Sequence, residues 1–281
     1  MSENAETVTK TSSVIAVPNL RVAWVLTVVV VLMAVAASAG GLLLPGLYRE
    51  PPAVAATIRA QDAVTLLVVV VLAVTFVVAR RGSTRATLVW VGLLGYVLYT
   101  YTGAAFAYTF NEFFLLYVSL FATSLFALIA LVAGLDAGEA RRRFDDAEPR
   151  CPVVLFLGLM ALVLGVGELG QVLAFFATGV PPELISGTGV SPNFVFALDL
   201  GIVVPLAALA AVWLWRRRSV GYVLSAAMLI LAATMGLALL AMTWSGVVAG
   251  LPLDVGLTVL WVLIAGGGIG LSVWFLRHCW G

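Results

Sequence analysis

Charged and reactive side chains are scarce in this chain of 281 residues. Only 10% of the residues are charged, against about 25% in soluble domains, which excludes an ordinary water-exposed domain. The single lysine is Lys10 and the single histidine is His278, so an intramembrane retinal Schiff base and a bis-histidine haem within one chain are excluded. The formal net charge of +1 provides no basic face for nucleic acid.

Cysteine is equally scarce. Cys151 and Cys279 lie far apart, and no Cys-x-x-Cys or Cys/His cluster accompanies them. Two cysteines are too few for a disulfide framework, and no metal-ligand spacing is present, so no cofactor is predicted. The polar N-terminus lacks the basic start and short apolar core of a secretory signal, which favours a cytosolic tail.

Apolar residues are abundant, at 63% of the chain, and the mean hydropathy is +1.13. Apolar runs long enough to cross about 30 Å of hydrocarbon, which takes about 20 helical residues, occur eight times. Long runs without alternation favour helices over a β-barrel. The sequence therefore predicts an all-α polytopic membrane protein with eight spans: Val22–Tyr48, Ala53–Ala79, Ala86–Tyr108, Glu112–Leu135, Val153–Thr178, Asn193–Trp215, Val220–Val248 and Asp254–Leu276.

The basic residues predict the orientation of these spans. With both termini cytosolic, only Arg49 and Arg59 lie on the outer side, as the positive-inside rule requires. A seven-span arrangement would place an arginine cluster outside. The predicted organisation is a cytosolic tail (1–21), four spans (22–135), a cytosolic linker (136–152), four spans (153–276) and a cytosolic C-terminus (277–281), in the cell membrane.

The two halves of the chain share a pattern. Asp62 precedes Arg80-Arg81 by 18 residues, and Asp199 precedes Arg217-Arg218 by 18. A Pro-Pro pair precedes each aspartate, and an aromatic–hydroxyl–glycine triplet follows each arginine pair. This pattern indicates a parallel 4+4 repeat, in which ligand sites lie near the interface of the halves. Shared membrane composition and the positive-inside rule are the alternative explanation.

Acidic residues outside the cytosolic segments all fall at the outer side, where they would attract cations: Glu50, Asp62, Glu112, Glu168, Glu183, Asp199 and Asp254. Asp62, Glu168 and Asp199 each lie 18 residues from an inner arginine. At about 1.5 Å per residue this is about 27 Å, which places them in the outer third of the membrane.

Glu168 interrupts an apolar run, with Gln171 one turn away on the same face. A charge near a helix centre costs about 2.5–3.5 kcal/mol, so the carboxylate needs a partner, a proton or a polar cavity. We expect Glu168, Asp199 and Asp62 to bind a cation or protons. A neutral structural role for Glu168 is the alternative, and an Arg59–Asp62 surface pair would account for Asp62.

Tyr96 and Tyr99 share a face of one span and, with Gln171, could orient a small substrate. An interfacial aromatic belt is the competing explanation for the tyrosines. Glu112 and Asp254 open spans, where helix capping is expected.

Glycines also form a motif. Gly165, Gly167 and Gly170 match G-x-G-x-x-G, but within a span this pattern indicates close helix packing or local unwinding beside Glu168, not nucleotide binding. The glycines at 266, 267, 268 and 270 likewise indicate close packing or a flexible point in the last span.

These features favour a small transporter or permease with an outward-facing acidic polar cavity for a cation or protons and a small substrate. One alternative is a ligand-binding sensor or assembly subunit without turnover. A second is an intramembrane enzyme that uses carboxylates and a divalent metal. The expected partners are the lipid bilayer and a small molecule or cation, with oligomer contacts through Gly/Ala/Ser-rich helix faces.

Overall fold

The computed structural model describes residues 17–181 and 193–280, with side chains from Arg21 onward. Within these residues the order is α1 (Val17–Leu43), α2 (Pro52–Arg80), α3 (Thr84–Ala107), α4 (Phe114–Ala133), α5 (Ala137–Arg142), α6 (Arg150–Thr178), α8 (Asn193–Leu198), the π-helix η1 (Asp199–Val203), α9 (Val204–Trp215), α10 (Ser219–Val248) and α11 (Val255–Arg277).

The predicted fold class is confirmed. Eight helical segments of the described chain are long and apolar enough to cross a membrane, with α8, η1 and α9 forming one continuous segment. The protein is an all-α, multi-pass membrane protein. The largest difference from the predicted bounds is at α1, which ends at Leu43 instead of Tyr48. Pro45 cannot continue a helix, and Gly46 adopts a φ of +79° that favours glycine.

The linker between the halves contains a helix that the sequence reading missed. Asp136 caps α5 by accepting a hydrogen bond from the Glu139 backbone N–H at 2.9 Å. The Glu139 carboxylate pairs with Arg142 (2.7 Å) and Arg143 (3.0 Å), and both arginines hold the pKa of Glu139 below its ordinary value. The spacing Asp-x-x-Glu, a capping-box variant, was the available signal.

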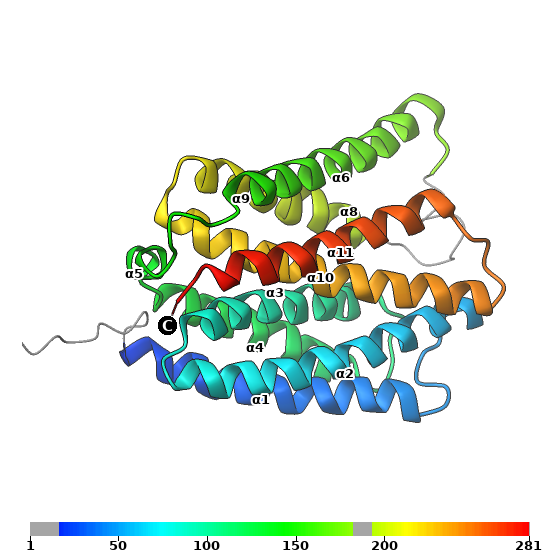
Figure 1. Cartoon of the computed structure of the whole chain (residues 1–281). Helices are drawn as coiled ribbons and strands as arrows, with labels where there is room; N and C mark the ends of the chain where they lie inside the picture. The colour runs from blue at the N-terminus through cyan, green and yellow to red at the C-terminus, as the bar shows by residue number, and fades with distance from the viewer. Residues whose placement is uncertain (1–16, 182–192, 281) are drawn as a thin grey trace, which may run out of the picture.

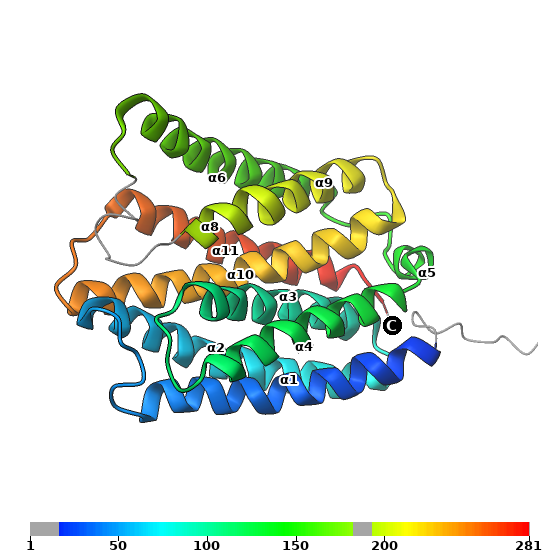
Figure 2. The same cartoon turned by 180° about the vertical axis from the view of Figure 1, so that it is seen from behind.

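The long helices pack in two groups (Figures 1 and 2). In the first, α1 contacts α2 and α4, and α3 contacts the same two helices. In the second, α9 contacts α6 and α10, and α10 also contacts α11. Helix α10 packs against α2 and α3 as well, so it joins the groups. The internal repeat and the orientation in the membrane stay predictions.

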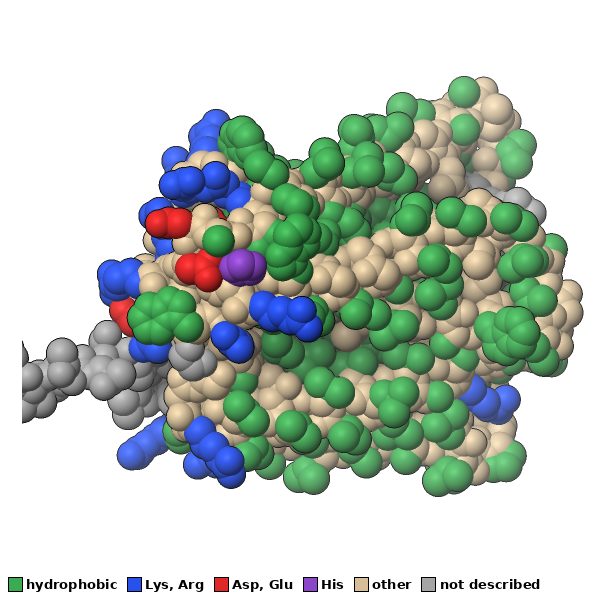
Figure 3. All heavy atoms as spheres, in the orientation of Figure 1, with side chains coloured by type: hydrophobic (Ala, Val, Ile, Leu, Met, Phe, Trp, Pro, Cys, Tyr) green, Lys and Arg blue, Asp and Glu red, His purple; other side chains and the backbone are tan. Residues whose placement is uncertain are grey.

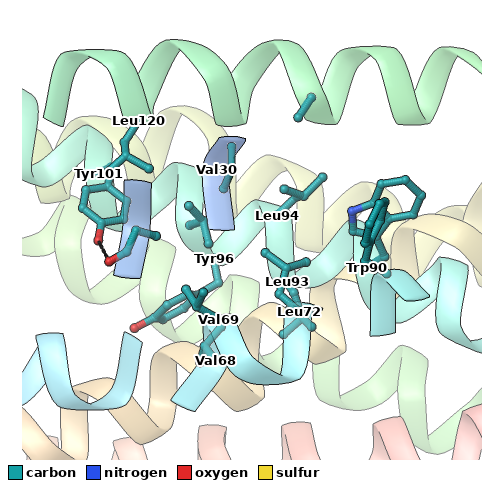
Figure 4. Close-up of a cluster of buried hydrophobic side chains, with 14 of the residues drawn as sticks. Val30, Val68, Val69, Leu72, Trp90, Leu93, Leu94, Tyr96, Tyr101 and Leu120 are labelled. Carbon is teal, nitrogen blue, oxygen red and sulfur yellow. Dashed lines mark hydrogen bonds between the residues drawn. The ribbon is translucent and has the colours of Figure 1, made fainter. Parts of the chain in front are cut away.

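The core of the first group is built from large side chains of α1 to α4. Trp90 and Tyr96 are fully buried, and Leu72, Leu93 and Leu94 lie with them (Figure 4). Trp90 donates a hydrogen bond to the Thr27 hydroxyl at 3.1 Å, so its polar atom is satisfied in the apolar interior. This group is therefore densely packed.

Close contact between α10 and α11 depends on glycine. A Cβ atom on Gly268 would lie 2.5 Å from the Ala233 backbone nitrogen, and one on Gly236 would lie 2.6 Å from the Ala265 nitrogen. A Cβ atom on Gly266 or Gly270 would have no atom within 4 Å. The predicted close packing is thus confirmed for part of the glycine cluster, since backbone contact leaves no room for a side chain.

The two ends of the molecule differ in charge. Figure 3 shows arginine side chains gathered at one end and a mostly hydrophobic surface along the helices. This arginine-rich end carries the starts of α3, α5 and α6, the α9–α10 turn and the C-terminus. The C-terminus is fixed there, because Asp145 donates its N–H to the His278 carbonyl at 3.0 Å and Trp280 donates to Arg143 at 2.8 Å.

Candidate functional site

Glu168 lies on the one side of α6 that faces the protein. The C-terminal half of α6 exposes nearly every side chain, and only Leu164, Gly165, Glu168 and Val172 are partly covered. Leu164 and Gly165 are neighbours, and Glu168 and Val172 follow at spacings of three or four residues, so the four positions form a single stripe along the helix. Glu168 therefore points toward the neighbouring helices and not toward lipid.

Asp199 lies at the first position of the π-helix η1. The Val204 N–H donates to the Asp199 carbonyl five residues earlier, and Pro205 follows directly. Because proline has no N–H, it cannot make the α-helical bond to Gly201, which accounts for the irregular turn. The glycine motif on α6 allowed either close helix packing or local unwinding beside Glu168. Unwinding is not observed, because α6 is continuous and the irregular turn lies on the partner segment.

Two glycines bring the three helices together. A Cβ on Gly103 of α3 would lie 2.7 Å from the ring of Phe194, so glycine lets α8 approach α3. A Cβ on Gly165 of α6 would lie 3.1 Å from a Val204 methyl group, so glycine also allows the approach of α9. Gly167 and Gly170 have no atom within 4 Å at this position. Only the first glycine of the motif is therefore a packing contact.

Tyr99, Asp199 and Glu168 meet at the junction of α3, η1 and α6. The Tyr99 hydroxyl donates a hydrogen bond to Asp199 Oδ1 at 2.9 Å. The Glu168 carboxyl lies within hydrogen-bonding range of the Asp199 carboxyl, and Tyr99 interacts electrostatically with both acids. Glu168 Oε2 is buried and has no hydrogen-bond partner among the described residues. The site thus has two carboxyl groups, one phenol and an unused acceptor.

The helices around this junction are loosely packed. No side chain of α6 beyond Ala161 is buried, none of α8 or η1 is buried, and none of α11 before Ile264 is buried. The C-terminal end of α6 stands away from the other helices (Figures 1 and 2). This region contrasts with the dense core of the first group.

Asp62 belongs to a different environment. It is 9% exposed and accepts a hydrogen bond from the Tyr48 hydroxyl in the α1–α2 loop. Burial, together with the nearby Asp62 charge, raises the pKa of Tyr48, so its hydroxyl keeps its proton and can donate. The alternative account of Asp62, a surface pair with Arg59, is not observed, because Asp62 is buried and bonds Tyr48 instead. A Cβ on Gly41 would collide with both Asp62 and Tyr48, so this meeting requires glycine.

The remaining predicted site residues do not join the junction. Tyr96 is fully buried, and its hydroxyl lies 2.9 Å from the Thr65 hydroxyl, so it faces α2 while Tyr99 faces η1. Tyr96 and Tyr99 lie one turn apart and about 60° around α3, since each residue of an α-helix turns by about 100°. The expectation that they orient one substrate together is therefore not met, because Tyr96 bonds α2 and Tyr99 bonds η1. Gln171 is exposed on α6, one turn beyond Glu168. A direct role of these residues in binding stays a prediction.

The other acids that were predicted to lie on the outer side have structural partners where they are described. Asp254 caps α11 by accepting from the Leu257 N–H at 2.9 Å, as expected. Glu112 does not cap α4, which begins at Phe114; it pairs with Arg49 at 2.6 Å instead. Hydrogen bonds to its own backbone N–H and to Arg49 hold the pKa of Glu112 below its ordinary value. Glu183 and the N-terminal tail lie outside the described residues.

A cavity of about 330 Å³ lies at the arginine-rich end, away from this junction. Its lining has both signs of charge and includes Arg141, Arg142, Asp145, Asp146, Glu148, Arg217 and Tyr222. Across the described ranges, no three His, Cys, Asp or Glu side chains lie together as a metal-binding group. The cavity contains none of the predicted site residues.

No protein-family model, curated protein or solved structure matches this chain. Sequence reasoning selected Glu168, Asp199 and Tyr99 but missed the buried loop residues Tyr48 and Glu50. Tyr48 was predicted to end the first span and Glu50 to be one of the outer acids. Neither position carried a signal for burial in a loop, because loop residues between spans ordinarily face water.

Proposed function

We propose that the protein is a small transporter in which Glu168 and Asp199 bind a proton or a small cation that is coupled to a small substrate. The supporting observation is the meeting of two carboxyl groups from different helices within the apolar spans, with Tyr99 donating to one of them at 2.9 Å. Ionisable groups inside a membrane typically mark proton and ion pathways.

The chemistry of the pair follows from its surroundings. Two carboxylates at hydrogen-bonding range in an apolar medium repel each other strongly, so they do not both stay ionised without compensation. One proton shared between them, or one small cation between their oxygens, supplies the compensation. Glu168 Oε2, which has no partner in the described chain, is available as a further ligand. A small cation would therefore displace the shared proton.

The packing around the pair supports a moving element. The π-helix at Asp199 breaks the regular hydrogen-bond pattern of its span, and such turns often occur at functional sites. Helix α6 has no buried side chain beyond Ala161, so its C-terminal half can change position at a small cost in free energy. Binding of a proton or cation between Glu168 and Asp199 would draw α6 and η1 together, and its release would let them separate.

The substrate would bind on the exposed side of the pair, where Gln171 offers an amide one turn from Glu168. With the arginine-rich end in the cytosol, the pair lies nearer the outer side. Asp62 and Tyr96, which lie in the first helix group, would act apart from this site.

Proton flux into liposomes that contain the purified protein and an enclosed pH-sensitive dye tests the proposal. Imposed gradients of sodium or potassium should drive counterflow of protons in the wild type. Glu168→Gln and Asp199→Asn should each abolish it. Asp254→Asn is the matched control, because asparagine also caps helices and the residue lies outside the pair. Equal flux in the double variant Glu168→Gln/Asp199→Asn and the wild type would contradict the proposal.

A further inference from the structure

The cavity at the arginine-rich end lies where the linker between the two helix groups meets the turn from α9 to α10. Helix α5 and residues 144–148 contribute to its lining, together with Arg217, Ser219 and Tyr222. Its volume of about 330 Å³ is within the range of small-molecule sites, about 300–1,000 Å³. The proposed transport site uses none of these groups.

Most acidic side chains of the cavity already have partners. Asp145 Oδ1 lies 2.9 Å from His278 Nδ1. Glu148 Oε1 accepts a hydrogen bond from the Tyr222 hydroxyl at 2.9 Å. Asp146 is exposed and has no ion pair or hydrogen bond with another described residue. One carboxylate is therefore available to a ligand.

Two of the three arginines of the cavity are not paired with an acid. Arg142 lies 2.7 Å from Glu139 on the same helix. Arg141 and Arg217 form no ion pair with any residue that the structure describes. The Arg141 guanidinium lies 5.8 Å from the centre of the Tyr222 ring. Two guanidinium groups are therefore available, against one carboxylate.

Arg217 has a backbone conformation that favours glycine. The N–H groups of Arg217 and Arg218 donate to the carbonyls of Leu214 and Trp213, each at 2.9 Å, which closes the end of α9. Turns of this kind place a left-handed residue, usually glycine, at the position of Arg217. Its φ is +54°, the only positive φ of a non-glycine residue in the described ranges. Strained residues of this kind cluster at ligand sites, which supports a functional role for the side chain.

The start of α10 adds further donors to the cavity. Arg218 is the N-cap residue, and no side chain caps the helix there. The first N–H groups of a helix have no partner within it, and the helix dipole is positive at this end. Ser219, the first residue of α10, lines the cavity. This end of α10 therefore favours the oxygens of an anion, in the same direction as the two arginines.

The available groups define the chemistry of the ligand. Arginine binds phosphate oxygens with two parallel hydrogen bonds, and a phosphate has enough oxygens for Arg141, Arg217 and the start of α10 together. The Asp146 carboxylate only accepts hydrogen bonds, so it favours a donor on the same ligand. We propose that this cavity binds a phosphate ester that carries an amine or hydroxyl group, with the phosphate at the two arginines and the donor at Asp146.

Two sources present this chemistry: a phospholipid headgroup and a free phosphate ester. The span that contains α9 ends at Trp215, which is 61% exposed, and the next span begins at Ser219. Tryptophan at the end of a span lies at the level of the lipid headgroups. The cavity is therefore within reach of both a headgroup and the water phase.

Calorimetric titration of the full-length protein with O-phosphoethanolamine, in detergent without phospholipid, tests the site. Wild type should bind one molecule per chain. Arg141→Gln and Arg217→Gly should each weaken binding about tenfold, because each removes a charge-assisted hydrogen bond. Glycine favours the left-handed turn, so the ligand-free melting temperature of Arg217→Gly should equal or exceed that of the wild type. Arg216→Gln is the matched control, because Arg216 belongs to the same turn and does not line the cavity.

Native mass spectrometry distinguishes the two sources. The protein is released from nanodiscs that contain phosphatidylethanolamine, whose headgroup is the same phosphoethanolamine. Lipid that stays on the wild type and is lost from Arg141→Gln/Arg217→Gly identifies the headgroup as the ligand. Binding of O-phosphoethanolamine without retained lipid identifies a free phosphate ester.

Three results would overturn the proposal. The first is the absence of saturable binding of both probes to the wild type. The second is an O-phosphoethanolamine affinity in Arg141→Gln and Arg217→Gly equal to that of the wild type. The third concerns the donor: inorganic phosphate should bind less tightly than O-phosphoethanolamine, and Asp146→Asn should remove this difference. Equal affinities of the wild type for the two compounds would contradict the role of Asp146.

Discussion

Replacing Gly165 by leucine should separate the two carboxyl groups of the proposed site. A Cβ at this position already lies 3.1 Å from a Val204 methyl group, and leucine adds three further carbons in that direction. Overpacking of this kind costs about 1–3 kcal/mol. For chains of about 200 residues, 1 kcal/mol shifts the melting temperature by about 2–4 °C, so a decrease of roughly 2–12 °C is expected. Glu168 lies one turn further along α6, so displacement of the helix also moves its carboxyl away from Asp199.

Gly167→Leu is the matched control within the same motif. No atom lies within 4 Å of a Cβ at Gly167, and leucine favours helix more than glycine does by up to about 1 kcal/mol. Its melting temperature should be equal to or above that of the wild type, with proton flux retained. The assays are tryptophan-fluorescence melting in detergent and the liposome flux measurement. Equal melting temperatures for the two variants, or full flux in Gly165→Leu, would refute the packing argument.

Three further predictions concern packing, charge and reactivity. Gly268→Ala should lower the melting temperature by the equivalent of about 1–3 kcal/mol, because its Cβ would lie 2.5 Å from the Ala233 nitrogen, whereas Gly266→Ala should not lower it. The pKa of Glu139 is lowered by its arginine partners, so its stabilisation of α5 exists above the unfolded-state pKa and is lost as pH falls; amide exchange in residues 137–142 should increase in acid, and less so in Glu139→Gln. Burial raises the pKa of Cys279 to about 11, so at pH 8 a maleimide should label exposed Cys151 and leave Cys279 unmodified, as peptide mass spectrometry can show.

The fold was largely predictable because membrane spans depend on length and hydropathy, which are local properties. Asn193–Trp215 was predicted with the bounds that the structure has, even though its middle is a π-helix. The short helix α5 was missed because six residues carry little hydrophobic pattern. A capping interaction between Asp136 and Glu139 defines its start.

The site was predictable only in part. An acid within an apolar run needs a partner, so Glu168 and Asp199 were predictable as site residues. Their sequence positions did not show that they are partners of each other. Their meeting depends on close approaches at Gly103 and Gly165, which are properties of three helices together. For Asp62 the sequence offered a partner on the same helix, Arg59, but the structure pairs it with another residue. Asp62 is buried and bonds Tyr48 from the α1–α2 loop.

Infrared spectroscopy of the carboxyl groups tests the central claim most directly. The protein in lipid at pH 7, in a buffer whose cations are too large to enter the pair, should show a carboxylic acid C=O band. Subtracting the spectrum of Glu168→Gln/Asp199→Asn should isolate this band, and a small coupling cation should remove it in the wild type. Asp254→Asn should leave it unchanged. A difference spectrum without such a band, or a band that is insensitive to every small cation and pH change, would contradict a proton- or cation-binding pair.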